Sequence, residues 1–371
     1  MVENMLQARK DFSRFGLALF AIGGITVILQ LLLSLLLQLL PEDSAVFNLE
    51  IMFWILNMGP MYLVAVPVGL LMMKKIPVEQ VQCQKLSIGR FLLLMLISMP
   101  LLYGGNIIGT LLSLLLSGGS AKNVLSDILT GSSLYPFIFT VLLAPFLEEL
   151  IFRKQIIDRL GKYGEKTAIF FSGITFGLFH MNLFQFFYAF GLGVIFAYVY
   201  TRTRMLRYSV IMHMIINFMG AVIAPAIVRL SESIMTVDPE AIDQFTKALP
   251  AMIITMLYSM SLIGLCIAGL VMLIIRWKKR VILPASHELL SGTVGKRRLA
   301  HNLPSFVVFS VIGGGLRCLW AVCLAAVELR GLPPTVWVWT GLVPAWVLTV
   351  LFSAAVYGVV WAERWLLKPK N

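Results

Sequence analysis

The sequence predicts an all-α protein, a helix bundle that crosses a membrane many times. Hydrophobic residues make up 59% of the 371 residues and charged residues only 13%, whereas soluble domains average about 45–50% and about 25%. The apolar residues also gather in runs long enough to cross a bilayer as helices, which takes about 20 residues. Basic residues, finally, concentrate in alternate loops between these runs. Together these observations indicate a polytopic membrane protein.

Apolar runs of the required length predict ten transmembrane helices. The first run is longer than the roughly 7–15 residues of a signal-peptide core and lacks a small-residue cleavage site, so we expect it to remain as the first span. The fifth and sixth spans are short and closely joined. The predicted spans cover residues 15–40, 51–73, 91–117, 134–157, 167–183, 185–201, 208–228, 249–275, 304–327 and 335–361.

Lysine and arginine set the orientation of these helices, because cytoplasmic loops are enriched in both. With the N-terminus inside, the predicted outer loops hold only Lys122, Arg229, Lys247 and Arg330. Both termini are therefore predicted to be cytoplasmic, and the pattern suits a bacterial plasma membrane. The net charge of +12 mostly reflects this bias. Because it is spread over alternate loops, it forms no single face that would bind nucleic acid.

The predicted spans divide the chain into three parts. Residues 1–275 form a helical domain of eight spans. Residues 276–303 form a basic cytoplasmic linker, which could contact anionic lipid headgroups. Residues 304–371 form a two-helix membrane appendage, to whose function the sequence gives no clue.

Two adjacent glutamates and an arginine stand in the fourth predicted span. Each costs about 2.5–3.5 kcal/mol at a helix centre, so deep placement requires compensation. Glu149 and Arg153 are four residues apart, in the order that favours an ion pair, whereas Glu148 points about 100° away. One carboxylate would then be paired and the other left to handle a proton. The apolar pattern continues past Arg153 and favours a helix that extends to Gly161; the alternative places all three charges at the cytoplasmic interface.

Two further spans supply polar partners for these charges. Phe176 and His180 are four residues apart in the fifth span, and His213 and Asn217 are four residues apart in the seventh. His180 and His213 are the only histidines in any predicted span. Helix rise places His180 at a depth similar to that of the glutamates, with His213 shallower. We expect these side chains to face one cavity.

The fifth span also carries a GxxxG pair, Gly173 and Gly177. Such pairs allow the backbone of a neighbouring helix to approach closely. We therefore expect another helix to pack tightly against this face.

The three polar motifs together resemble those of the CAAX protease and bacteriocin-processing family of intramembrane endopeptidases. The sequence has EExxxR at residues 148–153, FxxxH at residues 176–180 and HxxxN at residues 213–217, in the order found in that family. The resemblance is confined to about residues 134–220. It implies a protease-like helical domain that hydrolyses a peptide bond of a membrane-associated peptide or protein within the lipid bilayer.

The resemblance also implies roles for the motif residues. Glu148 would be the base that activates water, and His180 would help to hold that water. Glu149 and Arg153 would support the site. Such a division is chemically coherent, because hydrolysis requires a base for the attacking water and an acid for the leaving amine.

The third motif, His213 and Asn217, would by the same resemblance stabilise the oxyanion, which needs donors where charge develops. A zinc version would use Glu149, His180 and His213 as ligands with an open fourth position. The HExxH helix of many zinc proteases is absent. We favour water activated by glutamate, without a cofactor.

Two other classes of function stay open at this stage. Ionisable residues inside a membrane commonly mark proton or cation pathways, which would suit a transporter, although the sequence shows no convincing inverted repeat between its halves. A membrane scaffold or regulator could keep the fold without activity. The intact set of motif residues favours the protease.

The predicted orientation can be tested by cysteine labelling. In a cysteine-free background, a cysteine at position 122 should react with a membrane-impermeant thiol reagent in intact cells, and one at position 85 should react only after the cells are opened. These positions lie in a predicted outer loop and a predicted inner loop. The reverse pattern would contradict the orientation.

Overall fold

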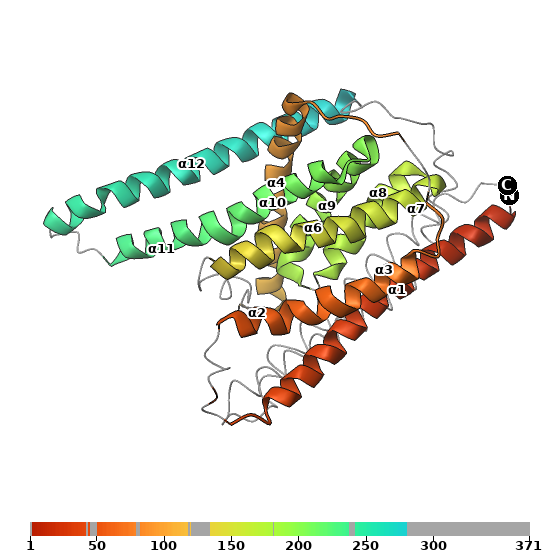
Figure 1. The fold of residues 1–371 in the computed structure, drawn as a ribbon. Coiled ribbons are helices and arrows are strands. Elements are labelled where there is room, and N and C mark those ends of the chain that lie inside the picture. The colour runs from red at the N-terminus through yellow and green to blue at the C-terminus, as the bar shows by residue number, and fades with distance from the viewer. Residues whose placement is uncertain are drawn as a thin grey trace.

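Every regular element in the described part of the chain is a helix (Figure 1). The computed structural model describes residues 2–41, 44, 50–78, 82–117, 119, 134–180, 182–236 and 242–279. Its α-helices are α1 (Val2–Leu37), α2 (Glu50–Gly59), α3 (Val66–Met73), α4 (Ile88–Leu116), α6 (Ala144–Glu149), α7 (Ile156–Leu160), α8 (Glu165–Phe179), α9 (Leu183–Thr203), α10 (Leu206–Phe218), α11 (Ala224–Met235) and α12 (Ile242–Lys279). Shorter π-helical segments are Pro60–Ala65, Pro136–Leu143, Leu150–Gln155 and Met219–Ile223, and a 3-10 turn covers Gly161–Tyr163.

Six helical stretches in the described residues are long and apolar enough to cross a membrane, which agrees with a multi-pass membrane protein. They are Lys10–Leu37, Ile51–Met73, Ile88–Leu116, Leu183–Thr203, Leu206–Met235 and Ile242–Arg276. Each coincides with one predicted span, within a few residues at most ends. The expected continuous apolar helix is thus confirmed at these six places.

The predicted fourth and fifth spans are helical but do not form long uninterrupted α-helices. The fourth alternates between π and α segments from Pro136 to Leu160, and the fifth, α8, has 15 residues. The count of ten helices and the cytoplasmic position of both termini stay predictions. The last two spans and nearly all of the linker at residues 276–303 lie outside the described residues.

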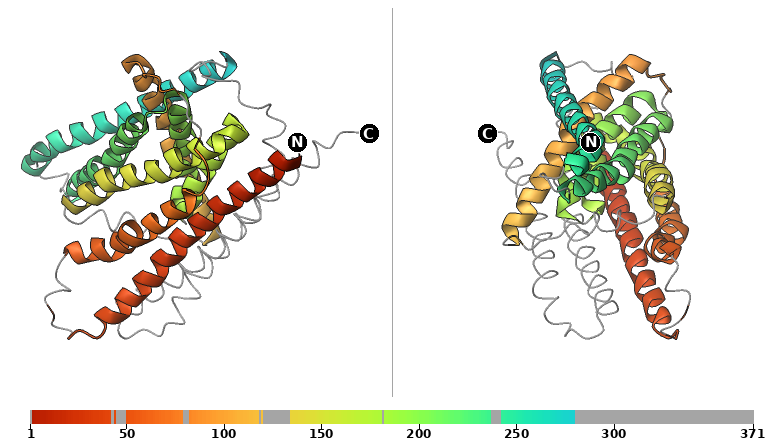
Figure 2. Two further views of the ribbon diagram at one scale, coloured as in Figure 1. Left: turned by 45° about the vertical axis from the view of Figure 1, so that its right-hand side comes forward. Right: turned by 90° about the vertical axis from the view of Figure 1, so that its left-hand side faces the viewer.

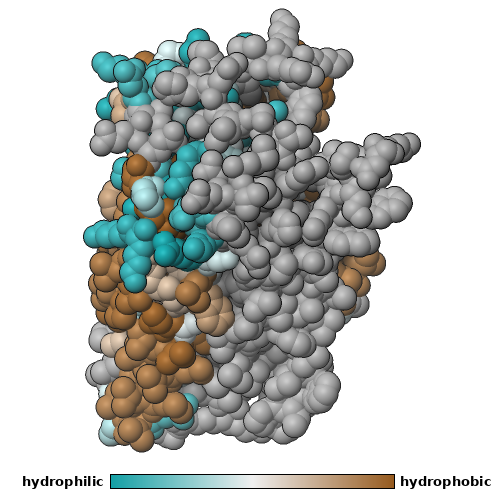
Figure 3. Space-filling model, turned by 90° about the vertical axis from the view of Figure 1, so that its right-hand side faces the viewer, coloured by the Kyte–Doolittle hydropathy of each residue, from teal (hydrophilic) through white to brown (hydrophobic). Residues whose placement is uncertain are grey.

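Large apolar side chains cover much of the outer surface. Leu36 on α1 is 59% exposed, Leu115 on α4 is 75% exposed and Ile267 on α12 is 60% exposed. Figure 3 shows one face on which hydrophobic side chains gather in the lower described region and hydrophilic ones lie above them. Lipid tails can cover such a surface without penalty, because the helices satisfy their own backbone groups.

The centre of the bundle is formed by α8 and α9. Helix α9 packs against both α8 and α4, and α12 packs on the other side of α4 (Figures 1 and 2). The predicted close approach at the GxxxG pair is confirmed. A Cβ atom added to Gly173 would lie 2.6 Å from the Val194 side chain, and one added to Gly177 would lie 3.0 Å from the Phe186 carbonyl oxygen. Both of these partners belong to α9.

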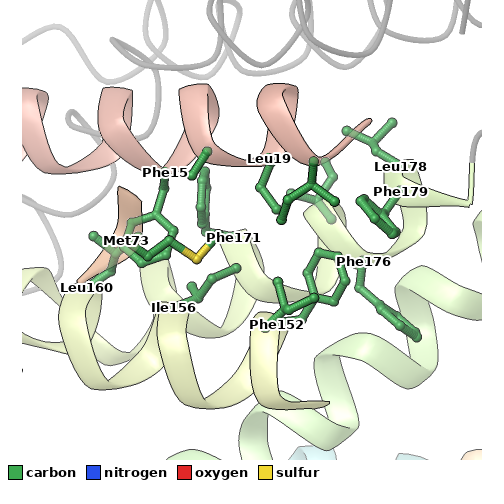
Figure 4. Packing of buried hydrophobic residues seen from close by; sticks show 14 of the residues in the cluster. Phe15, Leu19, Met73, Phe152, Ile156, Leu160, Phe171, Phe176, Leu178 and Phe179 are labelled. Atoms are coloured by element: carbon green, nitrogen blue, oxygen red, sulfur yellow. The ribbon is translucent and has the colours of Figure 1, made fainter. Parts of the chain in front are cut away.

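Aromatic residues fill the space between α1 and the central helices. Figure 4 shows Phe15 and Leu19 of α1 facing a cluster that includes Phe152, Phe171 and Phe176. These side chains are all at least 97% buried. Fully burying one such side chain contributes about 1.5–3 kcal/mol in water, and here the contacts hold α1 against the helices that carry the polar motifs.

Proline explains three of the four π-helical segments described. Pro67, Pro145 and Pro225 each follow a π segment by two residues, after Ala65, Leu143 and Ile223. Proline has no backbone N–H and cannot satisfy the carbonyl one turn before it. Widening the preceding turn changes which carbonyl lacks a partner, so the helix can continue through the proline instead of ending there.

Gly105 of α4 offers a test of this packing, with its neighbour as the control. A Cβ atom at Gly105 would lie 2.5 Å from the backbone nitrogen of Tyr188 on α9, whereas one at Gly104 would have no atom within 4 Å. We expect Gly105→Ala to lower stability by about 1–3 kcal/mol, as overpacking does. Gly104→Ala should be neutral or slightly stabilising, because alanine favours helix. Thermal unfolding of both purified variants measures the difference, and equal midpoints would contradict the packing.

Candidate functional site

The helix that carries the two glutamates continues beyond Arg153, as the apolar pattern predicted. The helical segments run without a break to Leu160, followed by the 3-10 turn at Gly161–Tyr163. Arg153 and Phe152 are 0% exposed, and Ile151 is 1% exposed. Glu149 and Arg153 are therefore enclosed by protein, whatever the depth of this helix in the membrane.

The predicted ion pair is present and buried. Arg153 Nε lies 3.0 Å from Glu149 Oε2, and both side chains are 0% exposed. The guanidinium carbon lies 4.3 Å from the centre of the Phe176 ring. Arg153 Nη1 donates to the Ser172 hydroxyl at 3.4 Å. Two ionised groups removed from solvent require this combination of ion pairing, aromatic contact and hydrogen bonding.

The π-helical segment Leu150–Gln155 lies between the two members of this ion pair. It differs from the other three described π segments because no proline follows it until Pro225. Short π segments without such a local cause are often found at functional sites. Here the wider turn begins directly after Glu149 and contains Arg153, so it fixes the geometry of the ion pair.

His213 of α10 joins both glutamates. Its Nδ1 lies 3.1 Å from Glu149 Oε1, and its Nε2 lies 3.8 Å from Glu148 Oε2. The first distance is a hydrogen bond. The second is longer than a direct hydrogen bond. The imidazole therefore sits between the buried carboxylate and the one beside it.

The two glutamates differ in their access to the surroundings. The Glu149 side chain is fully buried, whereas the Glu148 side chain is 14% exposed. The Glu149 carboxylate faces His213 through Oε1 and forms the ion pair with Arg153 through Oε2. The expected ion pair of Glu149 is therefore present, and the reactive role of Glu148 stays a prediction.

His180 lies at the C-terminal end of α8 and is partly buried. Its Nδ1 lies 2.8 Å from the Phe176 carbonyl oxygen, so Nδ1 carries a proton and donates this bond. The Phe176 ring lies 4.9 Å from the His180 ring and 5.5 Å from the His213 ring, centre to centre. The aromatic residue of the FxxxH motif thus contacts both histidines and Arg153.

Asn217 supplies a hydrogen bond that a proline removes from the helix of the glutamates. Its Nδ2 donates to the Thr140 carbonyl at 2.8 Å. Within the π segment Pro136–Leu143, carbonyls pair with the N–H five residues ahead, as Phe139 does with Ala144. Thr140 would pair with Pro145, which has no N–H. The side chain of α10 replaces this bond and ties the HxxxN motif to the helix of the glutamates.

The structure thus places the predicted site residues close together. The Glu149 side chain contacts His213 directly, and Arg153 lies against Phe176, which also contacts His213. Glu148 faces His213, and His180 contacts Phe176. Asn217 is one turn from His213 and bonds the backbone before Pro145. Glu148, Glu149, Arg153 and His213 thus meet at one place, and a cavity shared with His180 and Asn217 stays a prediction.

The sequence motifs did not identify several polar groups that contact the site residues. Ser172 hydrogen-bonds Arg153, and Thr140 gives its carbonyl to Asn217. Both are common residue types inside membrane helices, and no motif marks them. Pro145 could have indicated the second contact, because a proline inside a helix leaves one backbone carbonyl without its N–H partner.

The zinc version would use Glu149, which already has partners in this structure. Among the residues that the structure describes, no three His, Cys, Asp or Glu side chains are placed to hold a metal ion. Glu149, one of the three ligands considered, is already held by Arg153 and His213. A metal would therefore have to displace a buried ion pair.

Comparisons with known proteins agree with the motif resemblance. Residues 130–219 match the family described as type II CAAX prenyl endopeptidase Rce1-like. A curated Bacillus subtilis (strain 168) protein named "Putative membrane peptidase YdiL" is 34% identical over 84 residues, which are 22% of this chain and 33% of that protein. The chain therefore matches about a third of the length of this relative. No solved structure matches the chain.

The buried ion pair predicts a large effect of removing its cation. Arg153→Ala would leave the Glu149 carboxylate buried without its main partner, which costs about 3–5 kcal/mol in comparable cases. We expect a large loss of protein in the membrane and a lower unfolding midpoint. Arg207→Ala, which removes an exposed arginine on α10, is the control and should change neither. Equal accumulation of both variants, measured by immunoblot, would contradict the role of the pair.

Proposed function

We propose that this protein, whose residues 130–219 belong to the CAAX protease and bacteriocin-processing family, is an intramembrane endopeptidase. Its substrate would be a membrane-associated peptide or protein. The observation that carries the proposal is the unequal pair of glutamates. Glu149 is fully buried and held by Arg153, while Glu148 is partly exposed beside His213.

In the proposed reaction, Glu148 is the base. It takes a proton from water, and the oxygen of that water attacks the carbonyl carbon of the substrate. The C–N bond then breaks, and the proton passes from Glu148 to the leaving amine. Glu149 cannot take this role easily, because its two carboxylate oxygens already face Arg153 and His213.

Donors for the developing oxyanion come from the other motifs. The Asn217 amide carries two N–H groups, one of which bonds Thr140 and holds the side chain in place. The second N–H can donate to the substrate. His180 has Nε2 as its acceptor atom when Nδ1 donates to Phe176, so it can hold the proton of the attacking water. Preorganised groups of this kind stabilise the transition state without moving.

We propose a mechanism without metal, in which Glu149 stays paired with Arg153 and His213. The natural setting proposed is a bacterial plasma membrane, with both termini in the cytoplasm. CAAX prenylation is not expected there. We therefore propose hydrophobic peptide segments that enter the bilayer as the substrate class.

Glu148→Gln tests the proposed base. Glutamine keeps the size and most hydrogen bonding but cannot accept the proton, so cleavage should fall by at least about 100-fold while the protein stays folded and inserted. The assay is cleavage of membrane-spanning peptides by purified protein in lipid nanodiscs, followed by mass spectrometry. Glu232→Gln, at an exposed glutamate of α11, is the matched control and should keep full activity.

The same assay decides between the metal-free and zinc versions. A strong chelator should leave wild-type cleavage unchanged if no metal is used, whereas loss of activity that returns with added zinc would reassign His180 and His213 as ligands. Full activity in Glu148→Gln would remove the proposed mechanism. No cleavage by any form of the protein would favour the scaffold alternative.

A further inference from the structure

Helix α9 carries none of the three motifs, yet it contributes an aromatic side chain to the glutamate site. Phe196 is 0% exposed, and its ring centre lies 5.5 Å from the guanidinium carbon of Arg153. The same ring lies 5.2 Å from the His213 ring, centre to centre, with an angle of 32° between the two planes. The sequence does not mark Phe196, because it is one of several aromatic residues in an apolar helix.

Phe196 of α9 and Phe176 of α8 contact the same two side chains. The Phe176 ring centre lies 4.3 Å from the Arg153 guanidinium carbon and 5.5 Å from the centre of the His213 ring. Both aromatic rings are thus within the roughly 6 Å at which a guanidinium group is attracted to an aromatic face. Arg153 and His213 therefore lie against two aromatic rings, one from the FxxxH motif and one from α9.

A glycine of α9 makes room for this arrangement. A Cβ atom added to Gly193 would lie 3.0 Å from the Gly173 Cα atom and 3.1 Å from Cδ1 of the Phe176 ring. Gly193 and Phe196 are three residues apart and so lie on one face of α9. The Phe176 ring can therefore pack against the backbone of α9 about one turn away from the Phe196 ring.

The two rings meet the His213 imidazole at different angles. The Phe176 ring is perpendicular to it, at 90°, whereas the Phe196 ring is tilted by only 32°. His213 Nδ1 lies 3.1 Å from Glu149 Oε1, but the terminal torsion of a histidine is broad, so one hydrogen bond leaves the ring free to tilt. The two aromatic contacts restrict that tilt. His213 Nε2 is consequently kept on the side of Glu148 Oε2, 3.8 Å away.

We propose that Phe196 is a positioning residue of the peptidase site, which holds the His213 ring so that Nε2 stays directed toward Glu148. This inference rests on the proposed endopeptidase function. In that function Glu148 takes the proton of water while the HxxxN motif supplies donors for the oxyanion, so the imidazole must keep one orientation beside the base. Phe196 acts only through its neighbours. An aromatic ring suits this task, because it restricts the imidazole without offering it a competing hydrogen-bond acceptor from a polar side chain.

The first test is kinetic and uses the full-length protein in lipid nanodiscs, with a peptide whose cleavage depends on Glu148. Phe196→Leu removes the ring and keeps an apolar side chain, so kcat should fall about 10-fold or more while KM changes less than about twofold. Phe196→Tyr keeps the ring and should retain kcat within about threefold of the wild type. Phe12→Leu is the matched control and should keep the wild-type kcat, because Phe12 is 2% exposed and its ring contacts Tyr163 and Phe171.

The second test measures the orientation of His213 without any cleavage. The chain has four histidines, so selective isotope labelling of histidine nitrogen atoms gives few NMR signals, and those of His213 are assigned by their absence in His213→Gln. We expect one set of sharp signals in the wild type. In Phe196→Leu the signals should broaden or split, because the imidazole then samples more than one orientation. Phe12→Leu should leave them unchanged.

Each outcome decides the inference. Wild-type kcat in Phe196→Leu, with cleavage still lost in Glu148→Gln, overturns the positioning role and leaves the proposed function intact. The role is also overturned if Phe196→Tyr is as slow as Phe196→Leu, if Phe12→Leu is equally slow, or if the His213 signals do not respond to Phe196→Leu. Absence of cleavage by the wild type overturns the proposed function, and the catalytic role of Phe196 with it. If Phe196→Leu does not accumulate, Phe196→Met replaces it in both tests, because methionine fills irregular space in a core.

Discussion

The buried ion pair between Glu149 and Arg153 is the constraint around which the centre of this protein is arranged. Each charge would cost several kcal/mol if it were buried alone, so both must find partners in the same place. Arg153 stacks on Phe176, which lies on α8, and Glu149 binds His213, which lies on α10. Satisfying the pair therefore brings three helices to one point, and that point is where Glu148 is exposed.

Irregular helix geometry is the second element of the site. The segment before Ala144 widens into a π-helix ahead of Pro145, and the carbonyl that this leaves is taken by Asn217. The segment after Glu149 widens without any proline. A helix without proline at this place would satisfy its own backbone and have no need of α10 there. The irregularity thus connects the helix of the glutamates to the HxxxN motif.

The sequence predicted much of this arrangement, because the residues involved are conspicuous in an apolar chain. The spacing of Glu149 and Arg153 predicted their ion pair, and the scarcity of histidine indicated His180 and His213. The sequence did not predict the segmentation of the fourth span, because π turns depend on how carbonyls are shared near proline. It also missed the hydrogen bond from Asn217 to the Thr140 carbonyl, which arises only because Pro145 lacks an N–H.

The central claim, that Glu149 rather than Glu148 is the main structural partner of Arg153, is tested most directly by two double-mutant cycles on unfolding in lipid. One combines Glu149→Gln with Arg153→Met, and the other combines Glu148→Gln with Arg153→Met. The account predicts a coupling of about 2 kcal/mol or more for the first pair and below about 0.5 kcal/mol for the second. Equal couplings, or a larger one for Glu148, would contradict it.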